Sequence, residues 1–217
     1  EYFIASDVTP FLEHTDRAVF LEDDDYMIID GDYKIYNSGE KVEREVKEIE
    51  WDAEEAAKEG FDHIMEKEIR EQSKTVKRAS FQDRSDMEKA SEMIEEAEDV
   101  YITGSGTASF AASLGARYLR DKDVQVHTEQ SHELEYRSKE INEDDLVIAV
   151  SQSGETADLL SLLEEVASDV LAVVNVVGST LAREADHKLY VNAGPEIGVA
   201  STKAFTAQLA VLKLLSY

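Results

Sequence analysis

Short runs rich in apolar and β-branched residues alternate with helical stretches through the second half of the chain. Five such runs are predicted strands, at residues 100–103, 124–128, 146–150, 170–174 and 188–191. Apolar residues at helical spacing follow most of them, and residues 202–215 form the last predicted helix. Consecutive strands separated by helices form a parallel sheet with right-handed crossovers. The pattern therefore predicts an α/β fold, a doubly wound, flavodoxin-like parallel sheet.

The first half of the chain has a different pattern and predicts two further parts. Residues 1–45 are β-rich, and two short β-type runs flank Asp30-Gly31-Asp32, which is typical of a hairpin turn. Residues 46–85 are highly charged and are predicted to be a helical linker. The α/β domain is then expected at residues 86–217.

Two helices are expected before the sheet begins. In the first, four apolar side chains share one face that should pack against another element: Phe61, Ile64, Met65 and Ile69. Residues 73–84 have no clear period and are expected to form a boundary. A further apolar stripe marks the second helix, which enters the α/β domain: Met87, Ala90, Ile94 and Ala97.

Polar loops follow two of the predicted strands and precede the last helix. The strand at residues 146–150 gives way to Ser151-Gln152-Ser153-Gly154-Glu155-Thr156. The strand at residues 100–103 runs into Gly104-Ser105-Gly106-Thr107-Ala108-Ser109, and residues 194–203 open the last helix with two glycines, hydroxyls and a lysine. Glycine lets backbone approach a ligand, hydroxyls donate hydrogen bonds, and a helix N-terminus supplies free N–H groups and partial positive charge. Three such turns predict a shared crevice for an anionic small molecule at the carboxyl edge of the sheet.

Other interpretations of the polar stretches are open or weaker. The loop at residues 151–156, taken alone, could equally serve to cap the helix after it, and the two further turns favour ligand binding. Residues 131–136 hold a histidine and two glutamates, but not at the spacing of a zinc-binding helix. The acidic run at residues 22–25 lacks the glycine of a calcium loop, so turn chemistry explains it better. We predict no metal and no cofactor.

Composition limits the function classes. The chain has 217 residues, 42% of them hydrophobic, so a folded core is expected. It has no cysteine, which excludes disulfides, thiolate metal sites and cysteine nucleophiles from this chain. No apolar run of eighteen residues and no basic leader is present, so we expect no membrane contact and a cytoplasmic location. No basic patch interleaved with aromatic residues indicates a nucleic-acid partner.

The net charge of −26 is unevenly distributed. Residues 1–100 carry 31 acidic and 13 basic residues (−18), and residues 101–217 carry 17 and 9 (−8). The acidic excess avoids the part with the polar loops, as expected where an anion binds, and it would repel nucleic acid. Because the screening length falls to about 3 Å near molar salt, we expect a halophilic protein in a salt-rich setting. An acidic mesophilic protein with solvated carboxylates is the alternative.

Three strings resemble the glutamine–fructose-6-phosphate aminotransferase family, also called glucosamine-6-phosphate synthases. They are SQSGET at residues 151–156, NVVGS at residues 175–179 and EIGVASTKAFT at residues 196–206. All three match the first sugar-isomerase (SIS) domain of that family. Four upstream strings resemble the end of the family's glutaminase domain and the linker after it: residues 3–7, 20–23, 51–53 and 65–72.

The resemblance implies a fragment of such an enzyme. Residues 1–45 would be the end of the glutaminase domain, residues 46–85 the linker, and residues 86–217 the first SIS domain. The family converts fructose 6-phosphate and glutamine to glucosamine 6-phosphate and glutamate. Its catalytic lysine, glutamate and histidine lie in the second SIS domain and the C-terminal tail, so this chain should carry no catalytic residue and be inactive alone. Lys203 matches a structural or binding position, and the family's habit suggests a homodimer.

The resemblance also assigns a binding site for fructose 6-phosphate or glucosamine 6-phosphate. Its residues come from the three polar loops: Ser151, Gln152, Ser153, Thr156, Ser105, Gly106, Thr107, Val199 and Ser201. Ala108 stands where the family usually has serine, so one phosphate hydrogen bond should be missing unless Ser105 or Ser109 supplies it. Two other functions stay open at this point, a phosphosugar-sensing regulator and a non-catalytic binding module.

Overall fold

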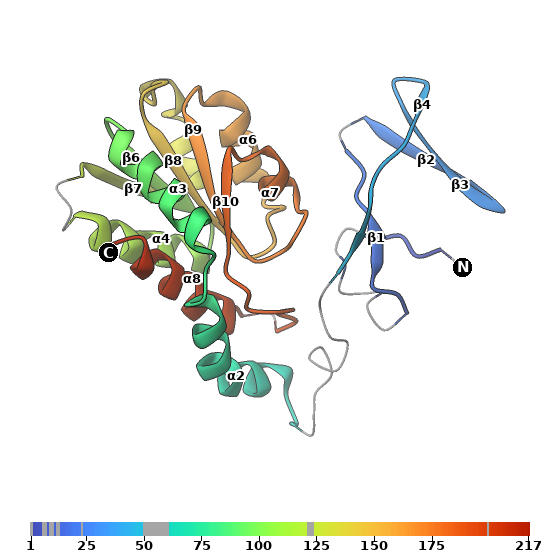
Figure 1. Cartoon of the computed structure of the whole chain (residues 1–217), viewed down its shortest axis with the longest axis horizontal. Helices are drawn as coiled ribbons and strands as arrows, with labels where there is room; N and C mark the ends of the chain where they lie inside the picture. The colour runs from blue at the N-terminus through green and yellow to red at the C-terminus, as the bar shows by residue number, and fades with distance from the viewer. Residues whose placement is uncertain are drawn as a thin grey trace. The chain divides into compact units, whose positions relative to one another are not determined.

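The computed structural model describes residues 2–5, 8, 11, 14–22, 24–49, 61–120, 124–198 and 200–217. The chain divides into two compact units, Glu1–Ala57 and Lys58–Tyr217 (Figure 1). Each unit is described by itself below.

A five-stranded parallel sheet forms the centre of the second unit. Its strands are β6 (Val100–Gly104), β7 (Val126–Gln130), β8 (Leu146–Ser151), β9 (Asp169–Val174) and β10 (His187–Tyr190). Their order across the sheet is β10-β9-β8-β6-β7, and every neighbouring pair is parallel. Counted along the chain from the β7 edge, this is the order 2-1-3-4-5 of flavodoxin-like folds. The predicted fold is confirmed, and each predicted strand is present within two residues of its expected ends.

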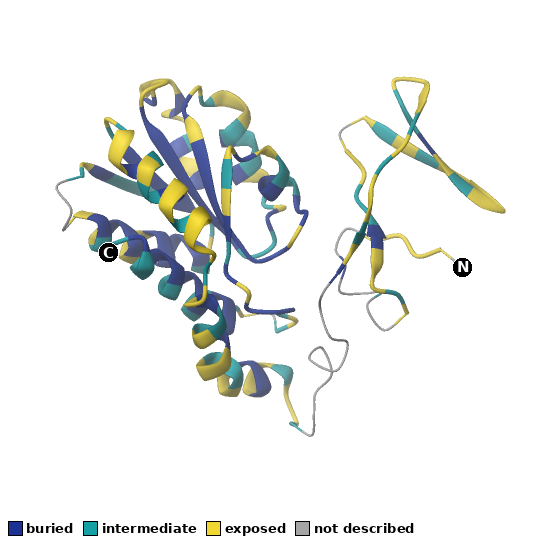
Figure 2. Ribbon diagram, viewed as in Figure 1, coloured by how far each residue is buried: buried dark blue, intermediate teal, exposed yellow. Residues whose placement is uncertain are grey.

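Helices cover both faces of this sheet (Figure 1). One face carries α3 (Arg84–Glu96), α4 (Thr107–Leu119) and α8 (Lys203–Leu214). The other face carries α5 (Ser131–Glu135), α6 (Ala157–Glu165) and α7 (Thr180–Glu184). The strand β8 is buried along its whole length because its side chains alternate between the two layers (Figure 2). Ile148 and Val150 belong to the first core, and Val147 and Ala149 to the second.

The strands β6 and β8 lie side by side, and the chain leaves their carboxyl ends toward opposite faces. The loop after β6 leads into α4, and the loop after β8 leads into α6. Neighbouring strands whose crossovers diverge in this way leave a crevice between the two loops. The fold therefore places the polar loops after β6 and β8 opposite each other.

The helix α2 (Ile64–Ala79) packs against α8, and it corrects two expectations. The apolar residues expected to dock are largely outside the contact, since Met65 and Ile69 are 44% and 46% exposed. The buried residues are Lys67, Glu68, Thr75 and Ala79. The expected boundary at residues 73–84 is also wrong over its first half, because the helix continues to Ala79, which lies in the core beside α8.

An ion-pair network explains why a polar helix face is buried here. The Lys203 ammonium donates a hydrogen bond to Glu71 Oε2 at 2.6 Å, and Lys67 Nζ lies 3.5 Å from Glu71 Oε1. Apolar periodicity cannot reveal such a face, because it treats every charged position as exposed. The stripe predicted for the next helix is confirmed in α3, where Ala90 and Ile94 are buried.

The described residues of the first unit form two antiparallel sheets. One pairs β1 (Arg17–Val19) with β5 (Val46–Glu48), and the other consists of β2 (Asp25–Asp30), β3 (Asp32–Asn37) and β4 (Glu40–Val42). The predicted hairpin is confirmed by the β2–β3 pairing, in which Asp30 lies opposite Asp32 around Gly31 at φ +75°. The strand β5 falls in the stretch predicted to be helical. That expectation is wrong for these residues, because the pairing of β5 with a strand far away in sequence leaves no local signal.

The acidic run before β2 has a structural role at Asp25. This carboxylate accepts hydrogen bonds from the N–H of Glu22 and from Nε and Nη2 of Arg44, each at 2.9 Å. These contacts, with the side chain of Arg44 first among them, hold the pKa of Asp25 well below its ordinary value. Turn chemistry is therefore the correct interpretation for Asp25. In the part of the chain that the structure describes, no helix is both long and apolar enough to cross a membrane.

Removing Glu71 should destabilise the second unit more than removing its partner does. Glu71→Gln leaves Lys203, 1% exposed, without its carboxylate, and breaking a buried pair this way lowers the free energy of unfolding by about 3–5 kcal/mol. Lys203→Met leaves Glu71 beside Lys67, so we expect the free energy of unfolding to fall by only about 1–2 kcal/mol. Urea denaturation measures both.

The exposed pair Arg84–Glu88 is the control. Glu88→Gln should change the free energy of unfolding by less than about 1 kcal/mol. A loss for Glu71→Gln no larger than that of Glu88→Gln would contradict a structural role for the buried network.

Candidate functional site

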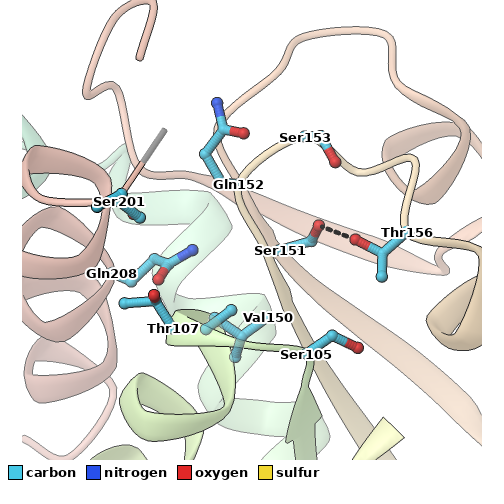
Figure 3. A pocket seen from close by; sticks show the side chains of 11 residues that line it. Ser105, Thr107, Val150, Ser151, Gln152, Ser153, Thr156, Ser201 and Gln208 are labelled. Atoms are coloured by element: carbon cyan, nitrogen blue, oxygen red, sulfur yellow. Dashed lines mark hydrogen bonds between the residues drawn. The ribbon is translucent and has the colours of Figure 1, made fainter. Parts of the chain in front are cut away.

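A cavity of about 240 Å³ lies at the carboxyl edge of the sheet, where the loops after β6 and β8 diverge. Its lining comes from these two loops, from the segment before α8 and from α8 itself (Figure 3). The lining residues are Ser105, Thr107, Ala108, Val150, Ser151, Gln152, Ser153, Thr156, Ala200, Ser201 and Gln208. None of these described residues carries a charge.

The structure brings most of the predicted site residues together. Seven of them line the cavity: Ser105, Thr107, Ser151, Gln152, Ser153, Thr156 and Ser201. Gly106 does not line it; it precedes α4 as the N-cap, with φ +56°. Val199 lies outside the described residues.

The loop after β8 is held by its own hydroxyls. Ser151 is 2% exposed, and its Oγ accepts the N–H of Gly154 at 2.9 Å. The same Oγ lies 3.4 Å from Oγ1 of Thr156 (Figure 3). Ser153 Oγ accepts the N–H of Glu155 at 3.1 Å. A hydroxyl that accepts a backbone N–H keeps its own proton for a further acceptor, so these serines can shape the loop and also donate to a ligand.

Gly154 fixes the loop against the turn before α7. It has φ +71°, and a Cβ built there would lie 2.1 Å from Oγ of Ser179. The adjacent Glu155 turns away from the cavity, because its Oε1 accepts the N–H of Thr180 at 2.8 Å. The carboxylate thus sits at the start of α7, and its charge is held outside the cavity.

The loop after β6 approaches the end of β8 closely. A Cβ on Gly104 would lie 2.7 Å from the carbonyl oxygen of Val150, so only glycine fits without a shift. The sequence left Ser105 or Ser109 as a substitute for the hydroxyl missing at Ala108, and both hydroxyls have partners within the protein. Ser109 donates its proton to the carbonyl of Gly106 at 2.7 Å and does not line the cavity, and Ser105 shares a hydrogen bond with Ser131.

Two glutamates that the sequence analysis did not single out hold the third loop. Glu196 Oε1 accepts the N–H groups of Thr202 and Ala204 at 2.7 and 3.2 Å, and its Oε2 accepts the hydroxyl proton of Ser201 at 2.8 Å. The N-terminus of α8 is therefore occupied by a carboxylate of the chain itself. From α2, Glu68 Oε1 accepts the N–H groups of residues 197 and 198 at 2.7 and 3.1 Å.

Gln208 is the third residue that the sequence analysis missed. It lines the cavity from α8 and is 1% exposed. A signal was present in the sequence, since Gln208 is a lone amide between buried Ala204, Ala207 and Val211 on an otherwise apolar helix face. Glu196 had a weaker signal as an acidic residue shortly before a helix, and Glu68 had none, because its partners are far away in sequence.

Comparisons with known proteins agree with this geometry. The family model described as "SIS domain" matches residues 93–216. The chain belongs to the SIS domain family. The cavity of this SIS domain is lined by residues from each of the three polar loops to which the sequence resemblance assigned a site.

Relatives extend the match beyond the SIS domain. A glutamine–fructose-6-phosphate aminotransferase [isomerizing] from Pyrococcus horikoshii is 43% identical over 225 residues, which cover 100% of this chain and 38% of that protein. One from Thermotoga maritima is 42% identical, with 98% of this chain and 37% of that protein covered. The chain thus spans a little over a third of the length of these curated relatives.

A solved structure is similar as well. It is the C-terminal domain of glucosamine-fructose-6-phosphate aminotransferase from Francisella tularensis, with a TM-score of 0.67 and 33% identity. The match covers 74% of this chain and 48% of that chain. The family resemblance drawn from the sequence is confirmed by these relatives.

The cavity of the SIS domain suits an anion that is bound by neutral donors. Thr107 begins α4 and Thr156 is the N-cap of α6, and both line the cavity, so the positive ends of two helix dipoles lie beside it. The lining holds hydroxyls and amides but no carboxylate or imidazole to act as a general base. Across the described residues no cluster of three metal-ligating side chains is present. The described lining is therefore suited to binding an anion.

Two glycine variants should separate crowding from backbone strain. Gly154→Ala adds a clash with Ser179 to a strained φ of +71°, and we expect a loss of about 2–4 kcal/mol in the free energy of unfolding. Gly106→Ala has φ +56° but no atom within 4 Å of the added Cβ, so about 1–2 kcal/mol is expected from strain alone. Chemical denaturation of the two variants tests this, and equal losses would refute the close packing at Gly154.

Proposed function

We propose that this SIS domain binds the sugar phosphate of a glutamine–fructose-6-phosphate aminotransferase. The ligand is fructose 6-phosphate or the product glucosamine 6-phosphate. The longer protein would then convert fructose 6-phosphate and glutamine to glucosamine 6-phosphate and glutamate. The observation that carries this proposal is the uncharged, donor-rich cavity at the starts of α4 and α6, in a chain 43% identical over its whole length to such an enzyme.

The proposed phosphate position is beside the loop at residues 151–156. Ser153 has a hydroxyl proton that can be donated to a phosphate oxygen, and the hydrogen-bonded pair Ser151–Thr156 has a second one. The first N–H groups of α6 lie behind them. A hydrogen bond to a charged acceptor contributes about 1.5–3 kcal/mol. Several such bonds can hold a dianion without an arginine or lysine, which fits the uncharged lining.

The proposed sugar position is on the side of Ser201. Its hydroxyl donates to Glu196, so its oxygen is left to accept a proton from a sugar hydroxyl. The catalytic groups of amination and isomerisation would come from parts of the longer protein beyond this chain. Residues 1–45 are proposed to be the end of a glutaminase domain, and α2 is proposed to be part of the linker at residues 46–85. A cytoplasmic homodimer completes the proposal.

Removing one hydroxyl should weaken phosphate binding measurably. Thr156→Val keeps the shape of the N-cap residue of α6 but loses a donor. We expect the Kd for fructose 6-phosphate and for inorganic phosphate to rise by about tenfold or more, measured by titration in two-dimensional NMR spectra of residues 1–217. Thr206→Val is the control, because Thr206 Oγ1 donates to the carbonyl of Lys203 and does not line the cavity.

The outcomes are distinct. The proposed function would be contradicted if Thr156→Val bound both ligands with unchanged affinity. It would also be contradicted if the unmodified chain did not bind fructose 6-phosphate. The chain alone is expected to form no glucosamine 6-phosphate from fructose 6-phosphate and ammonia. Detection of that product by mass spectrometry would show that catalytic groups lie within residues 1–217.

We also propose that the protein works in a salt-rich setting. The outward face of α3 is exposed (Figure 2) and shows the acidic excess of the chain. It carries two basic residues, Arg84 and Lys89, and five acidic ones: Asp86, Glu88, Glu92, Glu95 and Glu96. Repulsion among such groups is screened near molar salt. Raising KCl from 0.1 to 2 M should increase the thermal midpoint by on the order of 5 °C. A midpoint that is equal or higher at low salt would contradict this.

A further inference from the structure

Gln208 has a property that the other residues of the cavity lack. Among the described lining residues, it alone has a buried side-chain polar atom without a hydrogen-bond partner, the amide nitrogen Nε2. Its side chain reaches the cavity from α8, beside Thr107 and across from Ser153 and Thr156 (Figure 3). A buried donor without a partner costs free energy, and native structures rarely keep one without a reason.

The surroundings of Gln208 would accept an apolar side chain. Its neighbours on the buried face of α8 are Ala204, Ala207, Val211 and Leu212, all in the hydrophobic core. A methionine or leucine there would avoid the cost of the unpaired amide. The amide nitrogen therefore has no partner among the described residues, while the side chain lines a cavity that could hold a ligand.

The other residues on this side of the cavity either have a partner within the protein or carry no polar group. Ser201 donates to Glu196, Ser105 shares its hydroxyl hydrogen bond with Ser131, and Ala108 has no polar group. A sugar held with its phosphate at residues 151–156 would present hydroxyl oxygens to this wall. Thr107 and Gln208 are the side chains left to donate to them.

We propose that Gln208 is a ligand-binding residue and that its Nε2 donates a hydrogen bond to a hydroxyl oxygen of the sugar. This inference rests on the proposed function and deepens it. The hydroxyl loop at residues 151–156 recognises the phosphate that all sugar phosphates share. Gln208 reads the sugar portion, so it contributes to selection among phosphorylated ligands.

The test compares two ligands on two chains. Gln208→Met has a similar volume and no donor. Its Kd for fructose 6-phosphate should rise about three- to tenfold, the usual effect of one neutral hydrogen bond, while its Kd for inorganic phosphate stays within about twofold. In the unmodified chain, the side-chain NH₂ signal that Gln208→Met removes from NMR spectra should shift with fructose 6-phosphate and stay in place with inorganic phosphate.

Gln82→Met is the matched control. The amide of Gln82 donates to the carbonyls of Ala79 and Tyr190 at 2.8 and 2.9 Å, and it does not line the cavity. This variant should lower the thermal midpoint and leave the affinity for fructose 6-phosphate unchanged. Gln208→Met should show the reverse, with a midpoint equal to or above that of the unmodified chain.

Each other result overturns the inference. If Gln208→Met binds fructose 6-phosphate as tightly as the unmodified chain does, Gln208 makes no contact with the ligand. If its affinity for inorganic phosphate falls equally, Gln208 contacts the phosphate and not the sugar. A midpoint lowered as much as in Gln82→Met indicates a structural role. If Gln208→Met binds normally while Thr156→Val does not, only this inference fails. If the unmodified chain binds no fructose 6-phosphate, both the proposed function and this inference fail.

Discussion

The close approach of backbone at the carboxyl ends of β6 and β8 is the constraint on which the site depends. The absence of a side chain on Gly104 lets the first loop lie against the carbonyl of Val150, and Gly154 lets the second lie against Ser179. Because these neighbouring strands send their helices to opposite faces, both loops end at helix N-termini that border one cavity. A larger residue at either glycine would move a loop and with it the donors that the loop presents.

An acidic chain must keep its own carboxylates away from a site for an anion. Three glutamates near the cavity are occupied by backbone N–H groups of the chain itself. Glu155 accepts from the start of α7, Glu196 from the start of α8, and Glu68 from the loop at residues 197–198. Each carboxylate is thus stabilised by backbone N–H groups, and those of Glu155 and Glu196 also lie at helix N-termini, where negative charge is favoured. No carboxylate is among the described lining residues beside the starts of α4 and α6, so a net charge of −26 is compatible with a neutral pocket.

The same glutamates connect the cavity to α2. Glu68 holds the loop before α8, Glu71 pairs with buried Lys203 at the beginning of α8, and Glu196 orients Ser201 in the lining. The position of the third loop therefore depends on a helix that precedes the sheet in sequence. Since buried charges are stable only while paired, this contact favours one arrangement of α2 on α8 over its alternatives.

The sequence by itself determined the parallel sheet, its strands, the hairpin around Gly31 and the loops that carry the hydroxyls. Those features follow from local patterns: apolar runs between helices, and glycine and serine at strand ends. Only the tertiary structure decided that β5 pairs with β1, that α2 buries its charged face, and that Gln208 reaches the cavity with an unpaired amide. Each of these depends on partners distant in sequence, and the free energy of a buried polar group is set by the partner that folding brings to it.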